Sequence, residues 1–312
     1  MRFAPQTTLP AVGRVRDQAI SETLGLFVYS KAIHTMEPAM VELAQELFRG
    51  VTLAKMAIAV SMVVALSVIA EHVSPRIAGI LSGYPLGAAI SLFFLGLEIG
   101  VDFAAESAQY TMVGLIATQT FAFVYYKCSL RAANGGKIAG IVLSAGAGIS
   151  AYFLTITLCQ RLQTDLATAF LLSGFSIVGF SHLLKDVSDV KIEGKIPLDL
   201  KALVGRGLFA AVVIVLITAS ARAVGPAWAG LFSAFPLTML PLLVIMHFSH
   251  RVEHVHTTIK NGPKGIGSVL VYASAVNLWY PHLGVYLGTL VAYILATIYL
   301  VLVARFWRTP RH

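Results

Sequence analysis

Three histidines in the second half of the chain have spacings that could bind a transition metal or carry protons. His247, His250 and His254 follow at steps of three and four residues, which would put their imidazoles on one face of a single helix. No HExxH or CxxC spacing accompanies them, and Arg251 adjoins them. We therefore interpret the cluster as a polar patch at a helix end, with a metal site as the weaker alternative. No water-activating set stands out, so the sequence predicts neither an enzyme nor a cofactor.

Three carboxylates form a second candidate group. Glu98, Asp102 and Glu106 follow at steps of four, so they would share one face if a single helix runs through them. Mutual repulsion could raise their proton affinity into the working range, which makes Glu98, the deepest, a candidate proton-coupling residue. Ordinary solvated acids at a helix end are the alternative.

A segment of fourteen residues recurs 151 positions later. Residues 73–86 read VSPRIAGILSGYPL, and residues 224–237 read VGPAWAGLFSAFPL. Seven of the fourteen positions are identical, and Gly114 and Gly265 match at the same offset. Similar apolar composition would not keep two prolines, a glycine and a serine in register without gaps. The pattern therefore indicates an internal duplication.

Both copies carry a proline well inside an apolar stretch. Pro85 and Pro236 each remove a helical hydrogen bond, so we expect both helices to break there. The broken ends could hold an anionic group or a cation, and a simple kink packed by neighbouring helices is the alternative. The predicted substrate-binding residues are Ser82, Tyr84, Pro85, Ser233, Phe235 and Pro236. Further lining candidates, each more typical of an interhelical hydrogen bond, are Gln119, Ser173, Ser176, His182, Tyr272, Ser274 and Asn277.

The elements that must position these groups are membrane helices. The 312 residues are 57% hydrophobic and 12% charged, with a mean hydropathy of +0.79, which excludes a soluble two-domain protein, a coiled coil and a disordered chain. Each span needs about 20 apolar residues. Nine candidate spans follow, at residues 54–71, 77–98, 108–126, 138–159, 167–184, 203–221, 228–248, 265–280 and 283–304.

Basic residues in the loops predict the orientation. With nine spans, fifteen of the 23 Lys and Arg residues fall on the face that holds the C-terminus, so that face should be cytoplasmic and the N-terminus outside. This bias explains the net charge of +8, so no nucleic-acid partner is expected. The expected partners are the lipid bilayer and a small-molecule or ion substrate, and the sequence leaves a homo-oligomer open.

The repeat predicts the organisation of the chain. Four spans, an intervening fifth and four more give an offset of five spans, which inverts the second copy relative to the first. The fold class is thus an all-α polytopic membrane protein with two inverted four-helix repeats joined by a linker helix. The expected segments are an N-terminal polar or amphipathic segment, the first repeat, the linker helix with a cytoplasmic loop, and the second repeat, at 1–51, 52–160, 161–202 and 203–312.

The N-terminal segment does not read as a signal peptide or as a span. Residues 37–49 could form a helix lying on the membrane surface, because Met40, Leu43 and Leu47 share one face. The alternative is that translation starts at Met36 or Met40.

The second half resembles the GlpM-type bacterial inner-membrane proteins, which are small four-helix chains. The matching positions are Ala229, Gly230, Phe235, Pro236 and residues 257–259, so the whole chain resembles a duplicated form of such a unit. The resemblance implies a bacterial inner-membrane location and supplies no substrate or catalytic residues. Together these features predict a secondary transporter or permease for a small solute. The alternatives are a membrane scaffold or envelope assembly factor, and a metal-ion handling protein.

Overall fold

The computed structural model describes residues 53–58, 60–61, 64, 75–131, 136–162, 164–190 and 200–306. These residues belong to one compact unit, residues 51–312. The predicted N-terminal segment, with its surface helix at 37–49, and much of the first predicted span lie outside the described residues. Within the described ranges the elements are all helices and no strand is present, which confirms the all-α prediction.

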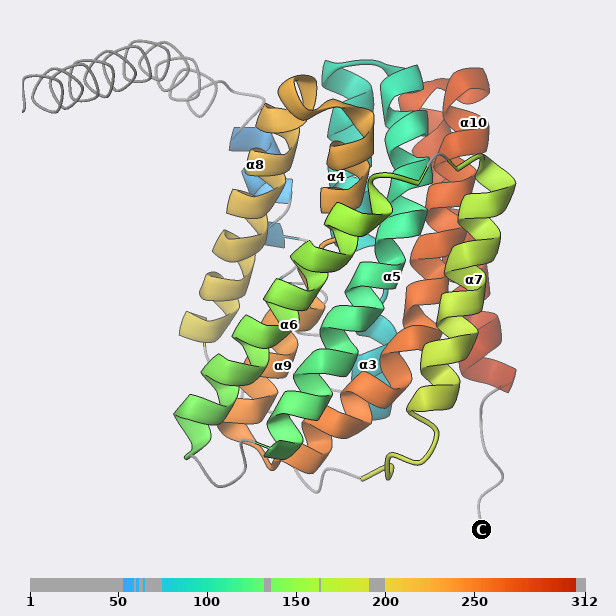
Figure 1. Ribbon diagram of the computed structural model, residues 1–312. Helices are drawn as coiled ribbons and strands as arrows, with labels where there is room; N and C mark the ends of the chain where they lie inside the picture. Colours follow the sequence, from blue (N-terminus) through green and yellow to red (C-terminus); the bar gives the residue numbers. More distant parts are fainter. Residues whose placement is uncertain are drawn as a thin grey trace, which may run out of the picture. The chain divides into compact units, whose positions relative to one another are not determined.

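The described helices follow one another in a bundle (Figure 1). In chain order they are α3 (Pro75–Ser82), α4 (Leu86–Glu98), α5 (Val101–Arg131), α6 (Lys137–Cys159), α7 (Leu166–Leu183), α8 (Leu200–Ser233), α9 (Met239–Ser249) and α10 (Val252–Phe306).

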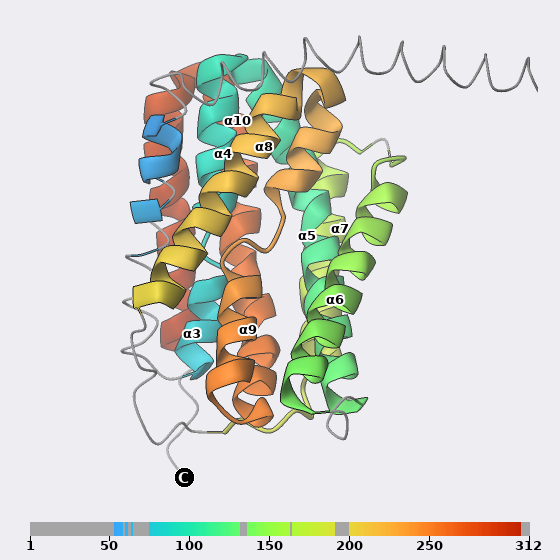
Figure 2. The ribbon, with the colours of Figure 1, turned by 90° about the vertical axis from the view of Figure 1, so that its left-hand side faces the viewer.

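Two of these helices reverse direction at one glycine. The chain turns back at Gly225 in α8, where φ is 79°, and at Gly284 in α10, where φ is 69° (Figures 1 and 2). Glycine adopts this left-handed region without the steric penalty that a Cβ would bring. Each of the two elements therefore supplies two helices that run in opposite directions.

Five helical segments among the described residues are long and apolar enough to cross a membrane. They are Gly79–Glu98, Lys137–Cys159, Leu166–Leu183, Gly207–Ser233 and Val252–Arg305. The first includes the break between α3 and α4, and the last includes both arms of α10. The predicted span at 108–126 lies within α5, which is not among the five.

The helices differ in burial: α5 lies at the centre of the bundle, and α7 exposes an apolar face. α5 packs against α6, α7, α8 and α10, and its Phe121 and Tyr125 are fully buried. α7 instead presents large apolar side chains outward, with Phe175 73% exposed and Val178 68% exposed. An outward apolar face of this kind suits hydrocarbon rather than water, so the perimeter agrees with the membrane class inferred from composition.

Glycines permit close helix crossings in the core. A side chain at Gly79 would collide with the backbone of Thr258 in α10, and one at Gly230 would collide with the backbone of Ser107 in α5. Gly230 lies 151 residues after Gly79, and Thr258 lies 151 residues after Ser107. The second crossing therefore repeats the first with the two halves of the chain exchanged.

A second pair of contacts follows the same rule. Gly83 packs against the backbone of Gly265, and Gly114 packs against Ala234, which is Gly83 shifted by 151 residues. Three helix boundaries also recur at this offset, namely Ser82 with Ser233, Glu98 with Ser249, and Val101 with Val252.

Candidate functional site

Both predicted helix breaks are present. α3 ends at Ser82 and α4 begins at Leu86, so Pro85 directly precedes the first turn of α4. α8 ends at Ser233 and α9 begins at Met239, with Pro236 between them. Proline cannot donate the helical hydrogen bond at its position and disfavours helical backbone in the residue before it. The two breaks therefore coincide with prolines, although Pro263 lies inside α10 without ending it.

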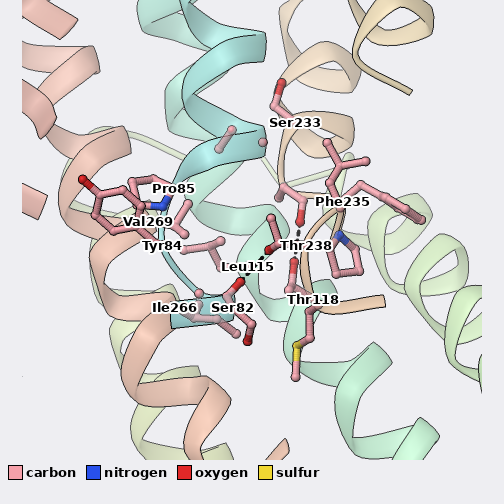
Figure 3. A pocket seen from close by; sticks show the side chains of 17 residues that line it. Ser82, Tyr84, Pro85, Leu115, Thr118, Ser233, Phe235, Thr238, Ile266 and Val269 are labelled. Carbon is pink, nitrogen blue, oxygen red and sulfur yellow. Dashed lines mark hydrogen bonds between the residues drawn. The ribbon is translucent and has the colours of Figure 1, made fainter. Parts of the chain in front are cut away.

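The two breaks line one cavity (Figure 3). It contains all six residues predicted for substrate binding: Ser82, Tyr84, Pro85, Ser233, Phe235 and Pro236. Its volume is about 40 Å³, which is room for a few water molecules. Leu115 and Thr118 of α5 and Ile266 and Val269 of α10 complete much of the wall. Segments 151 residues apart thus meet around one small chamber.

Hydroxyl groups donate hydrogen bonds to the carbonyl groups at the ends of α3 and α8, the helices that precede the two breaks. The Thr238 hydroxyl donates to the Ser82 carbonyl at 2.7 Å, and the Thr118 hydroxyl donates to the Ala234 carbonyl at 2.6 Å (Figure 3). The Ser268 hydroxyl donates to the Gly83 carbonyl at 2.9 Å. Each bond crosses from one half of the chain to the other, so the breaks are held together by side chains of the opposite half.

Backbone amides at the starts of α4 and α9, the helices that follow the two breaks, have no hydrogen-bond partner among the described residues. These are the amides of Gly87 and Ala88 in α4, and of Thr238 and Met239 before and at the start of α9. All four residues line the cavity. Helix N-termini carry partial positive charge and donate hydrogen bonds, so this chamber offers donors to whatever occupies it.

The aromatic residues of the two breaks differ. The Tyr84 hydroxyl lies 2.9 Å from the Thr297 hydroxyl in the second arm of α10, and its ring packs against Tyr293. Phe235 has no hydroxyl and instead packs edge-on against the buried Tyr152 ring, with centroids 5.1 Å apart. The first break is thus tied by a hydrogen bond and the second by aromatic packing.

Thr118, Thr238 and Ser268 were not among the predicted site residues. Thr238 stands two residues after Pro236, and Thr118 and Ser268 follow Gly114 and Gly265 by four and three residues. The signal in the sequence for these three residues was a hydroxyl side chain within four residues of a repeated proline or glycine. It could not be separated by sequence alone from ordinary helix-packing threonines and serines.

The further lining candidates lie elsewhere, and none of them is part of the cavity wall. The Gln119 amide donates to the Ser176 hydroxyl at 2.6 Å, and the Asn277 amide donates to the Ala105 carbonyl at 2.7 Å. These are the interhelical bonds that the residue types favoured.

The prediction that Glu98, Asp102 and Glu106 share one helical face is wrong. α4 ends at Glu98 and α5 starts at Val101, because the chain turns at Gly100 with a φ of 140°. Glu98 instead forms an ion pair with Lys55, with a shortest distance of 2.5 Å between Nζ and the carboxylate. The Lys55 ammonium also donates to the Thr218 hydroxyl at 2.9 Å and is 4% exposed.

The prediction that the three histidines share one helical face is also wrong. His247 lies in α9, His250 follows the end of α9 with extended backbone, and His254 lies in α10. His247 Nδ1 lies 3.1 Å from the Tyr125 hydroxyl, and the rings of His250 and His254 pack edge-on. Burial, then His254 and Lys137, lowers the pKa of His250. In the described part of the chain, no three His, Cys, Asp or Glu side chains gather closely enough to hold a metal ion.

Comparison with protein-family models, with curated proteins and with solved structures finds no match to this chain. The resemblance to GlpM-type proteins therefore stays a prediction from the sequence.

Proposed function

We propose that the protein is a secondary transporter or permease for a small solute across the bacterial inner membrane, with its C-terminus in the cytoplasm. The observation that carries the proposal is the single chamber between the two proline breaks. Irregular backbone in a membrane-embedded bundle is tolerated where it is buried in protein or lines a cavity, and transporters use such breaks as binding sites.

Crossed packing supports the inverted repeat on which alternating access would depend. The Gly79–Thr258 and Gly230–Ser107 crossings exchange the two halves of the chain, as a two-fold relation between the repeats requires. We count the first predicted span, α3 with α4, and each arm of α8 and α10 as one span each. On this count the two copies of the repeat lie five spans apart in the chain. An odd offset puts the pseudo-two-fold axis in the membrane plane.

The polarity of the chamber favours a solute with an anionic or hydrogen-bond-accepting group. Its carbonyl ends already accept bonds from Thr118, Thr238 and Ser268, whereas its amide ends have none. A carboxylate or a similar acceptor would satisfy those amides, whereas each of the three carbonyls already accepts one side-chain hydrogen bond. The cavity of about 40 Å³ corresponds to a closed state that must widen for any larger solute.

Uptake by reconstituted vesicles tests the proposal. A panel of organic anions, amines and metal ions should contain at least one transported solute, and anions should dominate. Thr118→Val removes the donor to Ala234 and should reduce uptake about tenfold, because a buried carbonyl loses its partner. Thr120→Val is the matched control, since among the described residues that hydroxyl bonds only within its own helix, to Ile116.

Two results would count against this function. No uptake in the entire panel would favour the scaffold or envelope assembly role. Equal loss in the Thr118 and Thr120 variants would remove the chamber from the proposal.

Glu98 stays our candidate for proton coupling, now through its pair with Lys55. Glu98→Gln should abolish the effect of a pH gradient on uptake while solute exchange without a gradient persists. Asp102→Asn is the control, because Asp102 is exposed at the start of α5. An unchanged response to the gradient in Glu98→Gln would assign the pair to stability alone.

A further inference from the structure

A second and larger cavity lies at the junction between α9 and α10, away from the proline breaks. Its volume is about 400 Å³, and its walls come from the end of α5, the start of α6, the end of α9 and the start of α10. None of its lining residues belongs to the central chamber. The two cavities are therefore separate sites.

Cationic groups line this cavity. Lys137 and Arg251 both belong to its wall. Arg251 is 81% exposed and makes a loose pair with Glu253, at 3.4 Å between Nε and Oε2. Lys137 makes no ion pair among the described residues. Glu253, the acidic group in the wall, is thus the competitor that an anionic ligand would displace.

One buried imidazole nitrogen in the wall also lacks a hydrogen-bond partner among the described residues. His247 lines the cavity and is 7% exposed, and only its Nδ1 is engaged, by the Tyr125 hydroxyl. When that hydroxyl donates to Nδ1, the ring proton resides on Nε2, which can then donate to a ligand. Among the described residues, the Nδ1 atom of His250 is buried without a hydrogen-bond partner, and so is the Oε2 atom of Glu253. His254 packs against His250, and the Ser129 hydroxyl is bonded to His256.

Two helix N-termini contribute to the same wall. α6 begins at Lys137 after Gly136, and α10 begins at Val252. Their partial positive charges add to those of Lys137 and Arg251. We propose that this cavity binds a phosphate group, because several donors from different directions suit an anion with several acceptor oxygens better than a single metal ion. This inference does not rest on the transport proposal.

Two sources could supply the phosphate, namely a free phosphate-bearing solute or a phospholipid headgroup at the end of the helices. Isothermal titration of the full chain in neutral detergent with inorganic phosphate examines the first. Native mass spectrometry with added phosphatidylglycerol against diacylglycerol, which has no phosphate, examines the second. Lys137→Gln and Arg251→Gln should each weaken binding in the responding arm about tenfold, as expected for loss of a charge-assisted bond.

Two further variants separate a built site from general surface charge. Lys127→Gln removes a cation that lies over the Phe123 ring outside this cavity, and it should leave binding unchanged. Glu253→Gln removes the competing carboxylate and should tighten binding about threefold. Binding in neither arm, or equal losses in the Lys127 and Lys137 variants, would overturn the proposal.

Discussion

The two junctions that lie 151 residues apart, α4 to α5 and α9 to α10, share a backbone device and differ in chemistry. Each ends a helix and restarts the next within three residues, at Glu98 to Val101 and at Ser249 to Val252. The first is filled by the Lys55–Glu98 ion pair, whereas the second opens into a cavity of about 400 Å³ beside His247 and His250. The difference teaches that helix ends can match between halves while the side chains beside them form an ion pair at one junction and line a cavity at the other.

The largest effect on the free energy of unfolding is expected from removing the ion pair at the α4–α5 junction. Glu98→Ala leaves the ammonium of Lys55 buried at 4% exposure without its carboxylate. Removing one partner of a buried pair costs about 3 kcal/mol, the low end of the usual range because Glu98 is partly exposed. Unfolding in detergent should show this loss, and Glu106→Ala, at an exposed position, should not. Equal stability of the Glu98 variant would mean that water reaches Lys55.

Removing both charges sharpens the same point. Lys55→Met combined with Glu98→Leu should restore stability to within about 1 kcal/mol of the original protein, because no buried charge remains. The double-mutant cycle measures the coupling between the two positions. Additive losses would show that the pair is not coupled.

Acid should lower the stability of the protein through His250 at the α9–α10 junction. The pKa of His250 is lowered in the folded protein, so the unfolded chain binds its proton more readily. The associated stability is complete above the ordinary pKa of 6.5 and is lost as the pH falls below it toward the folded value. The melting temperature should decline over this window, and His250→Gln should reduce the decline. His282→Gln, at an exposed position, serves as the control.

The smallest effect is expected for the cation of the open junction. Lys137→Gln should change the free energy of unfolding by no more than about 0.5 kcal/mol, since Lys137 is exposed and makes no ion pair among the described residues. A loss as large as that of Glu98→Ala would make Lys137 structural and would erase the contrast between the junctions.

The central chamber was predictable because proline has a local effect on backbone. Pro85 and Pro236 lie at the two helix breaks, and the 151-residue repeat distinguished them from Pro263 and Pro281, which lie inside α10 without ending it. The charged clusters were not predictable in the same way, because helical spacing places residues correctly only while one helix continues. Gly100 could have signalled the end after Glu98, whereas Ser249 and His250 carry no strong breaking residue. Lys55 was missed because its partner is 43 residues away.

The crossing of Gly83 with Gly265 has a mechanical consequence. No side chain separates the two backbone segments, so no side chain can change its rotamer to absorb a displacement. An occupant that pushes Gly83 outward must therefore also push α10. Leu278 lies further along that arm and is 49% exposed, so a spin label there would sense the filling of a chamber that it never touches.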